Sequence, residues 1–221
     1  MDRFVKIKEV AAPLLQSNID TDAIIPGNQL MRVSHSGFGG GLFANWRYRT
    51  ETNGERAENP DFILNQAPYK QAKILLAGPN FACGSSRETA VWALRDWGFV
   101  CIIAPSFGDI FYANCFKNRV LPIMLDFAAV KAIAGQVEDS NGEGRVTVDL
   151  EHCLVTAPDG RQFAFSINDY FRNVLLQGLD PVSAVLQYET AISEFQEADR
   201  MRRPWVYPDA ETAQKIEESV P

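Results

Sequence analysis

Residues 73–97 read KILLAGPNFACGSSRETAVWALRDW, and this stretch is the most informative part of the sequence. Its apolar start, residues 73–77, predicts a buried strand. Residues 89–97 predict a helix, and Gly98 after them is typical of a helix end. A loop of small residues therefore joins a buried strand to the start of a helix.

That loop brings the hydroxyls of Ser85 and Ser86 and the guanidinium of Arg87 to the start of the helix. Backbone N–H groups are free there, and the helix dipole favours negative charge. The loop is therefore a candidate site for a carboxylate or a phosphate. A structural alternative fits equally well, because Ser85 and Glu88 have the spacing of a capping box, and spacing alone favours capping.

The segments after this helix repeat the same order. Residues 99–104 predict a second buried strand, and residues 120–125 predict a third. Ser106 and Asp109 have the spacing of another capping box and predict a short helix between these strands. A β-α-β-α-β order favours parallel strands joined by right-handed crossovers. The expected fold class is therefore α/β, a layered sheet with a parallel βαβ core.

Further elements are expected on both sides of this core. They are strands at 4–10, 145–150, 153–157 and 162–167, the last two joined as a hairpin, and helices at 126–137, 168–177 and from 181 to about 200. We expect one domain over residues 1–200. The acidic, proline-interrupted tail at 201–221 is expected to be partly disordered or to lie against a partner.

Composition limits the classes of partner. The chain has 221 residues, of which 46% are hydrophobic, enough for a sizeable core. A net charge of −7 argues against general nucleic-acid binding, which needs a basic surface. No apolar run approaches the length of a membrane-spanning helix, and the first residues lack the apolar core of a signal peptide. We therefore expect a cytoplasmic protein with no membrane partner.

Metal binding by this chain alone is not expected. None of its four cysteines stands in a Cys-x-x-Cys pair, and the only histidines are His35 and His152. A self-contained zinc or iron–sulfur site would need more clustered ligands. Cys101 and Cys153 are interpreted as core residues. Cys83 lies in the loop and could be near a site, although packing is the favoured role.

Two segments near the N-terminus are unusual. Residues 18–26 read NIDTDAIIP, a turn-rich segment in which Asp20 and Asp22 flank Thr21. The stretch at about 27–61 is rich in glycine, asparagine and charge and predicts a long loop. Long loops inside compact domains are usually functional or mobile, and a plain surface excursion is the alternative.

Several stretches together resemble one family. NIDTDAIIP at 18–26 resembles the N-terminal signature of the small subunits of 3-isopropylmalate dehydratase. NFACGSSRE at 80–88 resembles the active-site segment of their aconitase superfamily. FGDIFYANCFKN at 107–118 resembles a third block, and residues 170–172 and 178–180 resemble the C-terminal part. The likeness runs in order over most of the chain.

The resemblance implies a swivelling β/β/α domain, like the mobile last domain of aconitase. It also implies a large-subunit partner that carries a four-iron–four-sulfur cluster, with no cofactor in this chain. The family reaction interconverts 2-isopropylmalate and 3-isopropylmalate by removing and re-adding water, in leucine biosynthesis. The substrate is then a small hydroxy-dicarboxylic acid, and the site is expected to form only at the subunit interface.

The matched motif implies roles for single residues. Ser85 corresponds to an alkoxide-like base, which needs nearby positive charge and amide groups to favour its ionised form. Ser86 would donate a hydrogen bond to the substrate, and Arg87 would hold a carboxylate in a bidentate manner. Asp22 and Arg32 are further candidates for substrate binding. The partner's iron would act as a Lewis acid on the departing hydroxyl.

The long loop at 27–61 is the candidate substrate-recognition loop, and its first part, 27–45, is expected to order at the interface. Leu30 and Met31 are expected to meet the alkyl group of the substrate. Arg47, further along, is a candidate partner for an anion. The alternative is a surface loop whose apolar residues simply cover the core.

One position departs from the family pattern, because Thr89 stands where histidine is usual. The change is interpreted as neutral packing, or as the mark of a related hydro-lyase acting on 2-methylmalate (citramalate). A serine hydrolase is disfavoured because Gly84–Glu88 lacks the second glycine of the nucleophile elbow. A non-catalytic paralogue is disfavoured because Ser85, Ser86 and Arg87 are all present.

Overall fold

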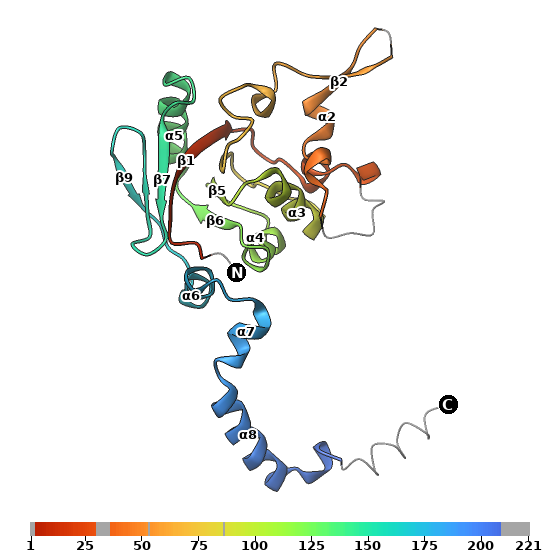
Figure 1. Cartoon of the computed structure of the whole chain (residues 1–221), viewed down its shortest axis with the longest axis vertical. Helices are drawn as coiled ribbons and strands as arrows, with labels where there is room; N and C mark the ends of the chain where they lie inside the picture. The colour runs from red at the N-terminus through yellow and green to blue at the C-terminus, as the bar shows by residue number, and fades with distance from the viewer. Residues whose placement is uncertain (1–2, 30–35, 53, 86, 209–221) are drawn as a thin grey trace. The chain divides into compact units, whose positions relative to one another are not determined.

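The computed structural model describes residues 3–29, 36–52, 54–85 and 87–208 (Figure 1). The chain divides into two compact units, Met1–Gly178 and Leu179–Pro221. A domain boundary near residue 200 stays a prediction, and most of the predicted tail lies outside the described residues. No helix in the described part of the chain is long and apolar enough to cross a membrane.

The first unit is built on a seven-stranded sheet with the strand order β6-β5-β4-β1-β7-β8-β9. Its strands are β1 (Lys6–Leu14), β4 (Ile74–Ala77), β5 (Cys101–Ala104), β6 (Leu121–Met124), β7 (Arg145–Asp149), β8 (Leu154–Thr156) and β9 (Gln162–Ala164). β1, β4, β5 and β6 are parallel, and β7 to β9 are antiparallel. The predicted α/β class with a parallel core and a C-terminal hairpin is therefore confirmed.

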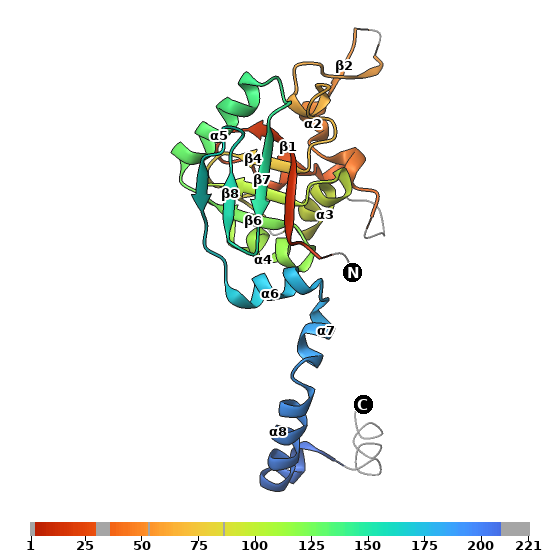
Figure 2. The ribbon, with the colours of Figure 1, turned by 60° about the vertical axis from the view of Figure 1, so that its left-hand side comes forward.

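Helices cover both faces of this sheet. They are α3 (Glu88–Trp97), α4 (Asp109–Lys117), α5 (Phe127–Asp139) and α6 (Asp169–Gln177). α3 and α4 contact each other beside the parallel strands, whereas α5 packs against β1, β4 and β5 (Figure 2). Every residue of β4 and β5 is buried, as expected for parallel strands with both faces covered.

The helix ends follow the local signals of the sequence. Gly98 and Gly178 end α3 and α6 in the left-handed conformation, with φ of +119° and +68°. The side chain of Asp126 caps α5, and that of Asn168 caps α6. The predicted helix end at Gly98 is therefore confirmed.

Two elements differ from the prediction. β1 continues to Leu14, beyond the strand predicted at 4–10. Its second half pairs with β4 and is mostly buried, so this half lacks the alternation of exposed and buried residues on which the prediction was based. The single helix predicted from residue 181 to about 200 is instead α7 (Pro181–Leu186) and α8 (Glu189–Arg202).

Within the second unit, a buried carboxylate fixes the end of α8. Asp199 is 2% exposed and accepts hydrogen bonds from Arg202, Arg203 and the hydroxyl of Tyr207. The contact with Arg203 leads the effects that lower the pKa of Asp199 to about 2. The short helix η4 (Pro204–Val206) is thereby held next to the end of α8.

The stretch at 27–61 is only partly a loop. It contains η1 (Gly27–Gln29), η2 (Gly39–Gly41), α2 (Ala44–Arg47), β2 (Tyr48–Thr50) and β3 (Arg56–Glu58), and η3 (Ile63–Asn65) follows it. Phe38, Leu42 and Phe43 in its middle are at most 2% exposed and belong to the core. The burial of these three side chains fits the alternative of a surface loop whose apolar residues cover the core, and the recognition role of the stretch stays a prediction.

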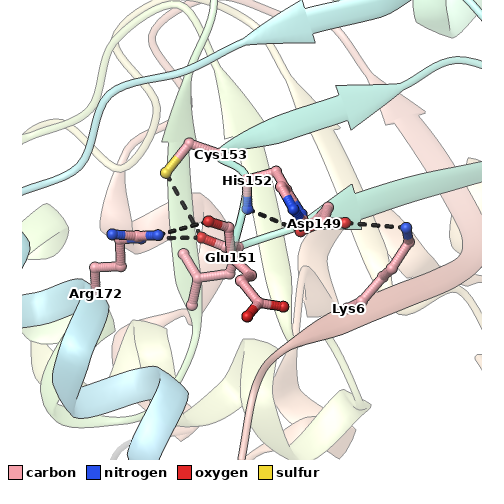
Figure 3. A network of polar contacts seen from close by, with 7 residues as sticks. Lys6, Asp149, Glu151, His152, Cys153 and Arg172 are labelled. Carbon is pink, nitrogen blue, oxygen red and sulfur yellow. Dashed lines mark hydrogen bonds and ion pairs between the residues drawn. The ribbon is translucent and has the colours of Figure 1, made fainter.

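Polar contacts fasten α6 to the sheet at the turn between β7 and β8 (Figure 3). Arg172 from α6 donates to the carbonyl oxygens of Leu150 and Glu151. On the other side of the turn, Asp149 lies 2.9 Å from both Lys6 Nζ and His152 Nδ1. Burial opposes ionisation of Asp149, but the hydrogen bonds from Lys6 and His152 outweigh it and hold the pKa of the carboxyl well below its usual range.

Two cysteine predictions concern the same sheet. Cys101 is fully buried in β5, as predicted. Cys153 packs against the core from its edge and remains partly exposed. Its Sγ lies 3.6 Å from the carbonyl oxygen of Leu150.

Candidate active site

The loops that follow β1, β4 and β5 meet at the carboxyl edge of the parallel strands. The N–H of Asn18, after β1, donates to the carbonyl of Pro79, after β4, at 2.9 Å. The N–H of Phe81 donates to the carbonyl of Ser106, after β5, at 3.0 Å. This edge is where open α/β sheets usually bind ligands.

The Asp20-Thr21-Asp22 signature holds the serine loop in place. Thr21 is 1% exposed, and its hydroxyl donates to the carbonyl oxygen of Ser85 at 2.9 Å. The N–H of Thr21 donates to the carbonyl of Cys83 at 3.1 Å. Asp20 caps the short helix α1 (Thr21–Ile24) by accepting from the N–H of Ala23 at 2.7 Å. The segments 18–26 and 80–88, which are far apart in the sequence, are therefore joined by hydrogen bonds at this edge of the sheet.

Ser85 does not cap α3, so the capping-box interpretation is wrong. The N-cap residue is Arg87, whose own side chain makes no capping hydrogen bond. The carboxylate of Glu88 instead accepts a hydrogen bond from Asn118 of the α4 end at 2.8 Å. Ser85 itself is exposed. The Ser85 hydroxyl therefore does not cap a helix, and it remains a candidate catalytic group.

The second predicted capping box is also wrong. Gly108 is the N-cap residue of α4, with no side-chain cap. The hydroxyl oxygen of Ser106 accepts from the N–H of Asn80 at 2.8 Å, and so connects two loops. The helix itself forms close to where it was predicted.

Ser85 and Arg87 line one pocket of about 200 Å³. The other described residues of its wall are Ala82, Gly84, Gly108, Asp109, Ile110 and Phe111. The motif at 80–88 thus faces the motif at 107–118 across a small cavity. Ala82 and Gly84 both have positive φ, +56° and +88°, which is uncommon for a residue with a side chain such as Ala82. Such backbone outliers often cluster at functional sites.

Arg87 forms an ion pair with Asp22 through its Nη1 atom. The side chain of Arg87 is 24% exposed and that of Asp22 is 58% exposed. The structure therefore brings the two predicted site residues together. A carboxylate already contacts the guanidinium, as a substrate carboxylate would.

Two other predicted site residues, Ser86 and Arg32, lie outside the described residues, as do Leu30 and Met31 of the recognition loop. Their roles stay predictions. Cys83 is described and partly exposed, next to the pocket residues Ala82 and Gly84 in sequence.

Arg47 does not serve as an anion partner, contrary to the sequence-based expectation. It is 4% exposed, and its Nη1 donates to the carbonyls of Gly39 and Leu42 at 3.3 and 3.2 Å. Its guanidinium also lies over the ring of Trp97, 4.1 Å from the centroid. Burial leads the effects on Arg47 and lowers its pKa. Arg47 fastens the Phe38–Phe43 segment to the core.

His152 cannot act as a base for Ser85. It binds Asp149, which pairs with Lys6 at the start of β1. The serine loop lies beyond the other end of β1, and nine strand residues span roughly 25 Å. Among the residues that the structure describes, no three His, Cys, Asp or Glu side chains are placed to hold a metal ion.

Comparison with known proteins shows which family has this fold. A family model described as the aconitase C-terminal domain matches residues 1–128, and the model LeuD_N matches residues 132–169. The solved structure named 3-isopropylmalate dehydratase from Methanocaldococcus jannaschii superposes with a TM-score of 0.60 at 23% identity, over 86% of this chain and 98% of its own, which shows a shared fold. The class is thus an α/β domain of the aconitase C-terminal type.

Relatives named 3-isopropylmalate dehydratase small subunit match almost the whole chain. The one from Cupriavidus necator is 48% identical over 209 residues, which are 95% of this chain and 100% of the relative. The one from Gluconacetobacter diazotrophicus is 47% identical over 93% of this chain and 97% of its own. The chain belongs to the family of 3-isopropylmalate dehydratase small subunits.

Proposed function

We propose that this chain is the small subunit of a 3-isopropylmalate dehydratase, a hydro-lyase that interconverts 2-isopropylmalate and 3-isopropylmalate in leucine biosynthesis. The observation that carries the proposal is the pocket lined jointly by Ser85 and Arg87. The similarity to named small subunits over nearly the full chain supports it.

The reaction needs a base and a group that holds a carboxylate, and we assign these roles to Ser85 and Arg87, which line the same pocket. Ser85, in its ionised form, would take the proton from the carbon beside a substrate carboxylate. The electron pair of that C–H bond becomes the second bond of the alkene as the hydroxyl leaves the neighbouring carbon. Arg87 would bind the carboxylate and stabilise the negative charge that develops there. Ser86 would donate a further hydrogen bond to the substrate.

The positive charge of Arg87 would also stabilise the ionised form of the Ser85 hydroxyl. A serine hydroxyl is a very weak acid, so its ionised form must be stabilised by nearby cations and amides. Asp22 partly offsets the charge of Arg87 in the chain by itself. A substrate carboxylate would compete with Asp22 for the guanidinium. We therefore propose that Asp22 holds Arg87 in position before substrate binds, in place of the direct substrate contact expected from the sequence.

We propose that a large subunit completes the site. The family resemblance implies that this partner carries the four-iron–four-sulfur cluster. When bound there, the cluster would supply a Lewis acid for the departing hydroxyl. Ser85 is exposed at the pocket, which leaves it accessible to a partner and to substrate.

Recognition of the substrate's alkyl group remains part of the proposal. The stretch at 27–45, with Leu30, Met31 and Arg32, is the proposed recognition loop. Thr89 lies partly buried in the first turn of α3 and is not among the described residues that line the pocket. This placement favours the neutral interpretation of the change from the usual histidine.

Reconstitution with a cognate large subunit tests the proposal. The complex, with its cluster assembled under anaerobic conditions, is assayed by the loss of alkene absorbance of isopropylmaleate and of citraconate. We expect a higher kcat/KM for isopropylmaleate. A preference for citraconate would point to a citramalate-type hydro-lyase, inactivity of a fully loaded complex to a non-catalytic paralogue, and hydrolysis of esters by this chain alone to a hydrolase.

A further inference from the structure

The lining of the pocket includes one large, exposed apolar side chain. Ile110, in the first turn of α4, lines the pocket together with Ser85 and Arg87, and it is 56% exposed. Exposed large apolar side chains are few in the described part of Met1–Gly178; they are Val5, Ile110, Met124 and Tyr170. Of these, Ile110 is the one that lines the pocket of Ser85.

Core packing fixes the position of Ile110. Its neighbour Phe111 is 4% exposed and stacks on Phe107, with ring centroids 6.3 Å apart and an interplanar angle of 15°. Phe111 also meets Phe81 edge to face at 5.6 Å. Phe81 belongs to the serine loop, so one aromatic cluster holds both walls of the pocket. Isoleucine is also stiff at its first side-chain torsion, so its branched side chain stays ordered.

Charges on the two walls favour one orientation of an anionic ligand. Arg87 attracts a carboxylate on one side of the pocket. Asp109 lies beside Ile110 on the other side and is exposed, so it repels a carboxylate there. These charges favour an orientation in which a carboxylate of the ligand lies toward Arg87 and its alkyl branch lies toward Ile110.

We infer that Ile110 is a specificity-determining residue that packs against the branched alkyl group of the substrate. The inference rests on the proposed function. An exposed isoleucine gains by contact with an apolar group, because both lose contact with water. One methylene in an apolar pocket changes the rate ratio by about 10- to 200-fold, so a short side chain at position 110 has a measurable effect.

The experiment uses the reconstituted complex with the large subunit in saturating excess. The quantity is the ratio of kcat/KM for isopropylmaleate to that for citraconate. We expect Ile110→Ala to lower the ratio at least about 10-fold and Ile110→Val to lower it less. Val5→Ala, a matched change at an exposed aliphatic residue outside the pocket, should leave the ratio unchanged.

Each outcome separates the inference from the proposed function. An active wild type whose ratio is unaltered by Ile110→Ala would overturn the inference alone. Equal losses for both substrates would also overturn it, because they indicate packing or assembly rather than contact with the alkyl branch. A wild-type complex that hydrates neither substrate would overturn the proposed function and the inference together. Thermal unfolding of each isolated variant checks that it is folded.

Discussion

The hydroxyl of Thr21 donates a hydrogen bond to the carbonyl oxygen of Ser85 at 2.9 Å, across 64 positions of sequence. Thr21 is buried, and its backbone N–H holds the carbonyl of Cys83 in the same loop. These two contacts explain why the segment 18–26 and the segment 80–88 belong to one site. We therefore expect Thr21 to act on the proposed chemistry through the position of Ser85.

Thr21→Val keeps the shape of the side chain and removes the donor. We expect the free energy of unfolding to fall by about 1 kcal/mol, because the hydrogen bond from the buried Thr21 side chain to the Ser85 carbonyl is lost. In the reconstituted enzyme, kcat should fall while KM changes little. Denaturant unfolding and steady-state kinetics measure the two effects. Thr21→Ser should restore kcat, and its failure to do so would argue against a positioning role for the hydroxyl.

Arg87→Lys tests the carboxylate holder. An ammonium group cannot reproduce the planar, bidentate contact, so we expect KM to rise at least tenfold with a smaller change in kcat. Asp22→Asn is the companion variant. Because the Asp22 side chain is 58% exposed, losing this ion pair should change stability by less than about 1 kcal/mol. An unchanged KM in Arg87→Lys would remove Arg87 from substrate binding.

Arg47→Lys tests the structural role of the buried guanidinium. Lysine cannot reach the carbonyls of Gly39 and Leu42 with the same geometry, so we expect a loss of about 2–4 kcal/mol in unfolding free energy. Arg49→Lys is the matched control. Arg49 is exposed and pairs with Glu51, so its change should stay within about 0.5 kcal/mol. Equal stability of both variants would contradict the role given to Arg47.

Asp149 should make the fold sensitive to acid. Its folded-state pKa lies below the unfolded value, so its carboxylate stabilises the fold above about pH 4. That contribution is lost as the pH falls from about 4 toward the lower folded-state pKa. Asp149→Asn should reduce stability at neutral pH and flatten the acid dependence, as followed by urea unfolding at several pH values. Asp159→Asn, an exposed carboxylate change, should preserve the wild-type slope.

The sequence predicts the elements whose signals are local. The buried runs of β4 and β5 and the terminator Gly98 each depend on nearby residues, and each is confirmed. The capping boxes fail because the side chains form other contacts: Glu88 bonds to Asn118 and Ser106 to Asn80. Such long-range contacts leave no spacing signal.

The sequence likewise predicts only those site residues that belong to recognisable local motifs. Ser85, Arg87 and Asp22 are recognisable from their motifs, and the structure brings Arg87 together with each of the other two. Ile110 gave no signal, because an isoleucine in an apolar helix segment resembles a core residue until its exposure is known. Arg47 was misassigned because no sequence pattern distinguishes a buried arginine from an exposed one.

Hydration of isopropylmaleate by the reconstituted complex carrying Ser85→Ala tests the role of Ser85 most directly. Ser85 caps no helix, so the variant should fold and assemble like the wild type, as checked by unfolding and by the stoichiometry of the purified complex. The predicted result is a loss of turnover by several orders of magnitude at wild-type assembly. Turnover within about threefold of wild type would contradict the assignment of Ser85 as the base.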